Sequence, residues 1–263
     1  MNNVNKTLYI PLYGKAMVSA KGVFLHDPDA ERIWAAEGFP LKGKSRSKWL
    51  AYYMGIRAAV FDAWLQRQMV RIPDAVVIHI GCGMDSRVHR VGAQGYDWYD
   101  VDFPDVIDER KRYYTENDQY HMIAGDASED AWLQKIPEGK RAIVVMEGVS
   151  MYLPAEKLQD MMRHLCARFE QVALLMDCYT MLAAKLSKYK NPINDVGVTQ
   201  VYGIDDPTLP AVEGWVFVQE HDMTPAQYID ELKGAEKWIF RKVFAGGFSR
   251  KMYRLFEYHV AKS

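Results

Sequence analysis

The sequence predicts an α/β protein built on a doubly wound parallel sheet, and two observations support this fold class. From Asp74 onward, short runs rich in β-branched residues alternate with longer amphipathic stretches, which is typical of a parallel sheet flanked by helices. The first run is followed by a glycine-containing turn, Gly81-Cys82-Gly83. In doubly wound folds such a turn lets the backbone approach a ligand at the end of the first strand.

The strand pattern predicts where a ligand binds. The expected strands are Ala75–Ile80, Trp98–Val101, His121–Ala124, Ala142–Met146 and Val172–Met176. In an open parallel sheet the carboxyl ends of the strands meet at one edge, so the residues that follow them are expected to converge there. These residues are Gly81, Asp102, Asp126, Glu147 and Asp177. Two further strands, over Trp215–Glu220 and Lys251–Val260, are expected near the end of the chain.

Two segments are predicted to cover the sheet edge. Tyr, Trp and Ala recur at helical spacing over Ser47–Gln68, and without a strand pattern residues 1–70 are expected to form a helical cap. Residues 71–263 are expected to form the α/β domain. Within it, a helix over Tyr179–Lys188 leads into a loop rich in Asp, Pro and Gly, so residues 179–214 are expected to cover a substrate.

Composition excludes several kinds of partner. The 263 residues include 33 Lys and Arg against 34 Asp and Glu, a formal net charge of -1, so no overall field favours nucleic acid or an anionic membrane. The longest apolar runs have the length of strands, far short of the roughly 18 residues that a transmembrane helix needs. We therefore expect neither a nucleic-acid nor a membrane partner. The oligomeric state stays open.

The amino-terminal segment and the cysteines indicate a cytoplasmic protein. The first residues lack the apolar core and cleavage site of a secretory signal. The three cysteines contain no C-x-x-C pair, which argues against a disulfide framework and a zinc site. We expect reduced, mostly buried thiols at Cys82, Cys166 and Cys178, and no bound metal.

The acids at the strand ends point to a nucleoside ligand. Asp102 can accept hydrogen bonds from both hydroxyls of a ribose. Asp100 lies on the same face of the strand and is the alternative, but Asp102 is nearer the strand end. Asp126 could face the amine of adenine, and Glu147 could pair with a ligand ammonium group. Each of these two acids would also fit the first turn of a helix.

The glycine turn leaves three readings open. The dinucleotide fingerprint needs a third glycine where this chain has Ser86, which counts against a nicotinamide-dependent oxidoreductase. A second alternative is a nucleoside-binding partner protein without catalytic activity. A third is an ordinary strand-to-helix turn with no ligand.

Three segments in this order and spacing resemble the leucine carboxyl methyltransferase family, including its bacterial polyketide O-methyltransferase members. They are Gly81-Cys82-Gly83-Met84-Asp85-Ser86-Arg87, Tyr99-Asp100-Val101-Asp102-Phe103-Pro104 and Glu147-Gly148-Val149-Ser150-Met151-Tyr152-Leu153. The match extends over about residues 10–169. The resemblance implies a class I methyltransferase sheet, mostly parallel with a reversed last strand, a helical N-terminal lid, and S-adenosylmethionine as the methyl donor.

The resemblance also implies contacts with the donor. Arg57 is similar to the arginine that binds the methionine carboxylate. Lys15 is similar to a second cation at this carboxylate, in an alignment that needs a one-residue insertion. The other implied contacts are Gly81 and Gly83 under the methionine part, Asp102 at the ribose, Asp126 and Ala127 at adenine, and Glu147 at the amino group.

The predicted function is S-adenosylmethionine-dependent O-methylation of a small-molecule acceptor, either a polyketide-like phenol or a carboxylate. A carboxylate is ionised near pH 7 and needs no base, whereas a phenol, with a pKa of about 10, would benefit from one. No catalytic base is assigned. Candidates for the acceptor site are Tyr152, Tyr179, His221 and His26, each of which could equally be structural or surface-exposed.

Overall fold

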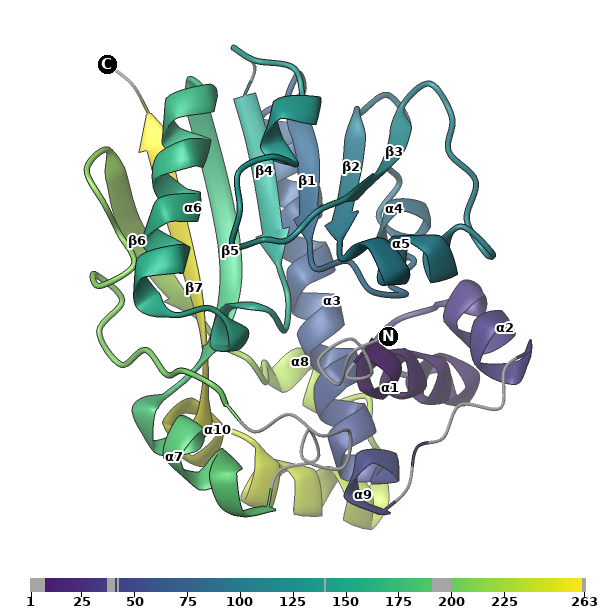
Figure 1. Cartoon of the computed structure of the whole chain (residues 1–263). Coiled ribbons are helices and arrows are strands. Elements are labelled where there is room, and N and C mark those ends of the chain that lie inside the picture. The colour runs from purple at the N-terminus through teal and green to yellow at the C-terminus, as the bar shows by residue number, and fades with distance from the viewer. Residues whose placement is uncertain (1–7, 37–40, 42, 140, 191–199, 262–263) are drawn as a thin grey trace.

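One mostly parallel sheet organises the protein. A computed structural model describes residues 8–36, 41, 43–139, 141–190 and 200–261 (Figure 1). Its strands are β1 (Val76–Ile80), β2 (Trp98–Asp102), β3 (Tyr120–Ala124), β4 (Arg141–Met146), β5 (Gln171–Tyr179), β6 (Trp215–His221) and β7 (Tyr253–Ala261). They form one seven-stranded sheet in the order β3-β2-β1-β4-β5-β7-β6. Strands β1 to β5 pair in parallel, and β7 runs antiparallel to both β5 and β6. The predicted fold class and the reversed last strand are confirmed.

Helices cover both faces of the sheet and its carboxyl edge. The longer ones are α1 (Tyr9–Lys21), α2 (Pro28–Ala36), α3 (Lys48–Arg71), α6 (Ala155–Arg168) and α7 (Met181–Lys190). The shorter ones are α4 (Arg87–Arg90), α5 (Pro104–Arg110), α8 (Ala226–Ile229), α9 (Gly234–Ile239) and α10 (Gly247–Met252). The predicted N-terminal helices are therefore present. Among the described residues, no helix has the length and apolarity needed to cross a membrane.

The central strands are buried on both faces, as their continuous apolar sequence requires. In Figure 1 α6 lies on one face of the sheet and α3 on the other. Leu158, Met162 and Leu165 of α6 are buried in one core cluster, and Phe61 and Trp64 of α3 are buried in the other. The apolar stripe of α6 is thus part of the core.

The strand order places a crevice beyond the carboxyl ends of β1 and β4. Strand β1 pairs with β2 on one side and with β4 on the other. The strands that follow β1 in the chain are therefore added first on one side of it and then, from β4 onward, on the other side. Ligands of open α/β sheets bind at such a switch point. In Figure 1 the carboxyl ends of these strands face α1.

Several expected boundaries are wrong, because pairing between distant segments moves them. Tyr179 belongs to β5, where it pairs with Tyr253 of β7, so the expected helix begins only at Met181. Lys251 lies in α10, not in the last strand. Within the predicted substrate cover, residues 191–199 lie outside the described part of the chain.

The segment between β6 and β7 contacts the N-terminal helices. Glu236 of α9 accepts hydrogen bonds from Lys21 at 2.5 Å, Lys48 at 3.0 Å and the Tyr52 hydroxyl at 2.9 Å. Glu231 accepts a bond of 2.6 Å from the backbone N–H of Phe24. The N-terminal helices therefore pack against a late segment of the chain as well as against the sheet.

Leu165→Ala should lower the free energy of unfolding by about 2–5 kcal/mol, since it opens a cavity in the core under α6. The matched change Leu186→Ala should cost no more than about 0.5 kcal/mol, because that side chain on α7 is exposed. Urea denaturation followed by circular dichroism measures both. Equal losses would contradict the assignment of α6 to the core.

Candidate active site

The predicted ligand residues line one cavity. It has a volume of about 410 Å³, which lies in the range of small-molecule sites. All eight residues assigned to the donor lie in its wall: Lys15, Arg57, Gly81, Gly83, Asp102, Asp126, Ala127 and Glu147. The fifth strand-end residue, Asp177, is fully buried and is not part of the described wall, although it contacts Arg57. The expected convergence therefore holds for four of the five strand ends.

The glycine turn brings bare backbone to the cavity. Gly81 and Gly83 have φ values of +67° and +51°, which side chains rarely adopt. A Cβ atom at Gly81 would lie 2.1 Å from Cγ2 of Val149. This is far shorter than a contact between two carbon atoms, so a side chain at position 81 would displace Val149. The glycine segment is followed by α4, a helix of only four residues. The conformation of the segment therefore depends on its glycines and on the side chains around it.

Asp102 and Asp100 lie in different environments. Asp102 accepts hydrogen bonds from the N–H groups of Gly83 at 2.7 Å and Phe103 at 2.8 Å. Burial nevertheless raises its pKa to about 6. Asp100 is fully buried, forms an ion pair with Arg110 and accepts a bond from the Trp98 indole. Asp102 is the one that lines the cavity, which agrees with the preference for it; its role at the ribose stays a prediction.

Arg57 is a buried cation that contacts side chains on β5 and β7 and one directly after β4. Its Nε atom lies 3.0 Å from Oε1 of Glu147, and its Nη1 atom lies 2.9 Å from both Oδ2 of Asp177 and the Tyr253 hydroxyl. Burial lowers the pKa of Arg57, but Tyr253, Glu147 and Asp177 outweigh it and raise the pKa well above its usual value. With 3% exposure, Arg57 is not a solvated helix residue. Lys15 of α1 is also buried and lies 2.9 Å from Oδ2 of Asp85.

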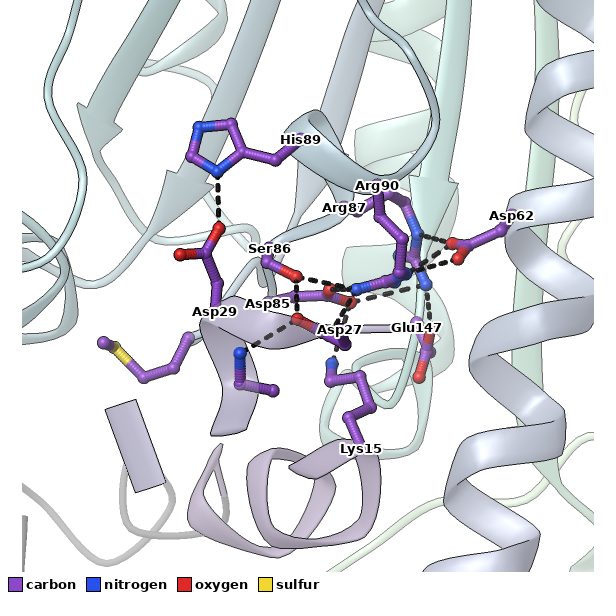
Figure 2. Close-up of polar contacts among 12 residues, drawn as sticks. Lys15, Asp27, Asp29, Asp62, Asp85, Ser86, Arg87, His89, Arg90 and Glu147 are labelled. Atoms are coloured by element: carbon purple, nitrogen blue, oxygen red, sulfur yellow. Dashed lines mark hydrogen bonds and ion pairs between the residues drawn. The ribbon is translucent and has the colours of Figure 1, made fainter. Parts of the chain in front are cut away.

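Glu147 lies between two arginines, of which Arg87 had no predicted role. Arg87 is fully buried and pairs with Glu147 and with Asp62, the latter at 2.7 Å (Figure 2). It also contacts Nε2 of His79 at 3.2 Å. Burial would raise the pKa of Glu147, but Arg87 and Arg57 lower it to about 2. Glu147 is therefore ionised at neutral pH.

A second group of side chains, also missed by sequence reasoning, ties the glycine turn to the N-terminal helices. Arg90 contacts Asp27 at 2.6 Å, Asp62 at 2.5 Å and Asp85 at 3.0 Å. Figure 2 shows these side chains meeting between α2, α3 and α4. The only sequence signal was a pair of arginines three residues apart after the turn, which by itself does not identify partners.

Of the four candidates for the acceptor site, only Tyr152 is among the described residues of the cavity wall. Tyr179 packs edge-on against Tyr253 with ring centroids 5.0 Å apart. His221 contacts Glu257 at 2.6 Å on the edge of the sheet. His26 is exposed and lines a separate hollow of about 470 Å³ beside α2 and α4. Within the described residues, no cluster of His, Cys, Asp and Glu could hold a metal ion.

Residues 4–166 match the leucine carboxyl methyltransferase family. The chain belongs to this family. A curated relative, the tetracenomycin polyketide synthesis O-methyltransferase TcmP of Streptomyces glaucescens, is 33% identical over 186 residues, which are 70% of this chain and 69% of that protein. The S-adenosyl-L-methionine-dependent methyltransferase dpfgK of Gibberella zeae is 28% identical over 179 residues, which are 62% of this chain and 60% of that protein.

The fold of this leucine carboxyl methyltransferase family member is also similar to solved methyltransferases. Magnesium protoporphyrin IX methyltransferase from Synechocystis PCC 6803, solved with bound SAH, superimposes with a TM-score of 0.53 at 14% identity. The match covers 95% of this chain and 100% of that one. The chain is an S-adenosylmethionine-dependent methyltransferase, and the oxidoreductase and non-catalytic alternatives are not favoured.

The affinity for S-adenosylhomocysteine should depend on pH through Asp102. Ribose hydroxyls bind the ionised carboxylate, so above its pKa of about 6 affinity should be constant. Below this pH, binding must release a proton, and affinity should fall by up to about tenfold per pH unit. Isothermal titration calorimetry from pH 5 to 8 measures this. Asp102→Asn should bind more weakly and with no such slope; an unchanged slope would exclude Asp102 as its source.

Proposed function

We propose that this enzyme transfers the methyl group of S-adenosylmethionine to an oxygen atom of a small-molecule acceptor, either a polyketide-like phenol or a carboxylate. The observation that carries the proposal is the gathering of all eight donor-binding candidates around one cavity at the switch point of the sheet. The choice of oxygen and of a polyketide-like acceptor rests on the similarity to the Streptomyces O-methyltransferase.

The order of polar groups along the cavity matches the order of groups in the donor. Asp126 and Ala127 follow β3, Asp102 ends β2, and Gly81 and Glu147 follow β1 and β4. Adenine, ribose and the methionine part would then lie across the strand ends in this sequence. Gly81 and Gly83 carry no side chain, so the glycine turn leaves room for the methionine part at these two positions.

The charges in the cavity suit the amino-acid end of the donor. Glu147, ionised as its low pKa requires, would accept hydrogen bonds from the ammonium group, since each carboxylate oxygen has more than one acceptor position. Arg57 uses Nε and Nη1 for its partners, and no described residue accepts a bond from Nη2. This second amino group of the guanidinium is available for the donor carboxylate, with Lys15 of α1 as the second cation.

Once bound, S-adenosylmethionine supplies an electrophilic methyl group that the acceptor oxygen displaces from sulfur. The chain contributes chiefly by orientation, because the attacking oxygen must lie in line with the methyl carbon and the sulfur. The buried ion pairs around Arg57 and Arg87 keep the donor-binding groups in place. An ionised carboxylate acceptor needs no base, whereas a phenol must lose its proton on transfer.

The direct test is isothermal titration of the purified protein with S-adenosylmethionine, S-adenosylhomocysteine and NAD in parallel. We expect binding of the first two and no binding of NAD. A supporting result justifies assays of O-methylation with phenols and carboxylic acids. Binding of NAD alone would overturn the proposal.

Arg57→Lys should weaken binding of S-adenosylhomocysteine by roughly tenfold and binding of adenosine by less than about twofold, because adenosine lacks the carboxylate that the guanidinium fork binds. Lysine is preferred to alanine, which would leave Glu147 and Asp177 without their buried counter-charge. Titration calorimetry with both ligands measures the difference. The control is Arg141→Lys, at a half-exposed ion pair with Asp74. Equal losses for the two ligands would reject the assignment.

A further inference from the structure

We propose that one end of the protein, formed by α7 and by the run from α9 to α10, binds the surface of a bilayer that contains anionic lipids. This basic end is distinct from the methyl-transfer site, and its proposed role does not depend on that site. Contact with a bilayer surface requires no spanning helix, so it is compatible with the helices of the described residues.

The cations of the chain are concentrated at the basic end. Residues 181–190 and 233–254 contain ten Lys and Arg and a single acid, Glu236, which leaves 23 Lys and Arg against 33 Asp and Glu in the rest of the chain. In Figure 1 the helices of these two segments, α7, α9 and α10, lie together at the lower end of the molecule. The net charge of -1 for the whole chain hides this separation, which is why composition alone predicted no membrane partner.

The acids near the basic end do not cancel its charge. Asp230 pairs with Lys237 at 3.1 Å and also with Arg241. Glu220 of β6 pairs with an arginine of α10 at 3.2 Å and with one of β7 at 2.6 Å. Glu231 bonds to the backbone of the loop after α1. Four further cations of this end are exposed lysines: Lys185, Lys233, Lys242 and Lys251.

Large apolar side chains are exposed beside these cations on α7. Met181, Leu182, Lys185 and Leu186 are all exposed, whereas Ala183, Ala184 and Ser187 are buried. Residues three or four apart lie on the same face of a helix. One face of α7 therefore packs on the protein, and the opposite face presents methionine, leucine and lysine to the solvent.

The same combination is present on α9 and on η6 (Phe240–Phe244), the helical segment that continues it. Trp238 is 64% exposed, although tryptophan is a residue type that is highly buried on average. Arg241 and Lys242 follow it by three and four residues and are exposed, as is Val243. Phe240 is buried. This helix thus also presents an apolar side chain between cations to the solvent.

Helix α10 joins the two exposed helix faces into one surface. It contacts both α7 and η6, and its Arg250 and Lys251 are exposed. A recess of about 310 Å³ in this surface is lined by three cations, one carboxylate and two other residues: Arg250, Lys251, Arg254, Asp205, Thr180 and Leu182. A recess with an excess of cations suits the phosphate of a lipid headgroup better than the apolar anchor of a protein partner.

A bilayer with anionic lipids matches this combination of side chains. Lys and Arg are attracted to its negative surface, while exposed Trp and Leu enter the boundary between headgroups and acyl chains. The indole of Trp238 suits this boundary because it is apolar apart from one N–H group. A second copy of the chain that presented the same surface would bring like charges together.

The test is co-sedimentation of the whole protein with two kinds of vesicle, one of phosphatidylcholine alone and one of equal parts phosphatidylcholine and phosphatidylglycerol. Binding to the mixed vesicles should be at least about tenfold tighter, because several cations face the negative surface. It should weaken as the salt concentration rises, since salt screens exposed charges.

Two variants separate the charge from the apolar contact. Lys242→Glu combined with Lys251→Glu should weaken binding to the mixed vesicles by at least about tenfold. Trp238→Ala should weaken it by roughly fivefold, because the largest exposed apolar side chain of this end is lost.

Matched controls lie on other parts of the molecule. Lys111→Glu combined with Arg163→Glu makes the same change in net charge at two exposed cations, after α5 and on α6. Leu209→Ala removes an exposed leucine whose carbonyl contacts α6. Both controls should bind within about threefold of the wild type, because distant exposed charges are screened. Circular dichroism spectra should match the wild type in every variant.

The outcomes bear on the basic end alone. Wild-type protein that binds neither kind of vesicle, or binds both equally, overturns the inference and leaves the methyl-transfer site untouched. Equal losses in the two charge-reversal variants would attribute binding to the overall field of the protein. Poly-L-glutamate that binds as tightly as the mixed vesicles, with Trp238→Ala unaffected in both assays, would assign this end to an acidic protein instead.

Discussion

The buried carboxylate of Glu147, held between Arg57 and Arg87, is the interaction on which the site depends. It joins the end of β4 to α3 and to the helix after the glycine turn. Removing one partner of such a buried pair costs about 3–5 kcal/mol, because a charge is left without compensation in a medium of low polarity. The same arrangement keeps Glu147 ionised, so that one side chain stabilises the fold and also meets the requirement of its proposed role at the ammonium group of the donor.

From this centre the charges extend into the N-terminal helices. Lys15 contacts Asp85 of the glycine turn, and Asp27 contacts Arg90 of α4. Glu236, in a late segment of the chain, contacts Lys21 at the end of α1. The cavity is thus built from the sheet and the N-terminal helices together. We expect the N-terminal helices to restrict access to the donor, since one of its proposed cations lies on α1.

The cavity wall combines charged and apolar residues, and both suit the binding of a small molecule. Ionised and hydrogen-bonding groups line the cavity at the strand ends, and α1 adds both apolar side chains, Leu8, Pro11 and Leu12, and the charged Lys15. Polar groups fix the orientation of a ligand, and apolar surface supplies contact area. In the proposed reaction, the charged groups of the donor and the apolar part of an acceptor would contact different residues of this wall.

The strands, the glycine turn and the strand-end acids could be predicted from the sequence alone, because each depends on residues close together in the chain. Periodicity shows a buried strand, and the topology rule brings the carboxyl ends of parallel strands to one edge. The resemblance in three segments added the donor and the two cations, Arg57 and Lys15.

Only the tertiary structure decided which side chains meet. Tyr179 became part of β5 because β7 pairs beside it, and Asp177 lies behind Arg57 rather than in the described cavity wall. Arg87 and Arg90 gained their roles from acids on distant elements. Hydrogen bonds and ion pairs act over a few ångströms in space, whereas sequence patterns report only neighbours along the chain. For that reason the strand ends could be located from the sequence, but their network of partners could not.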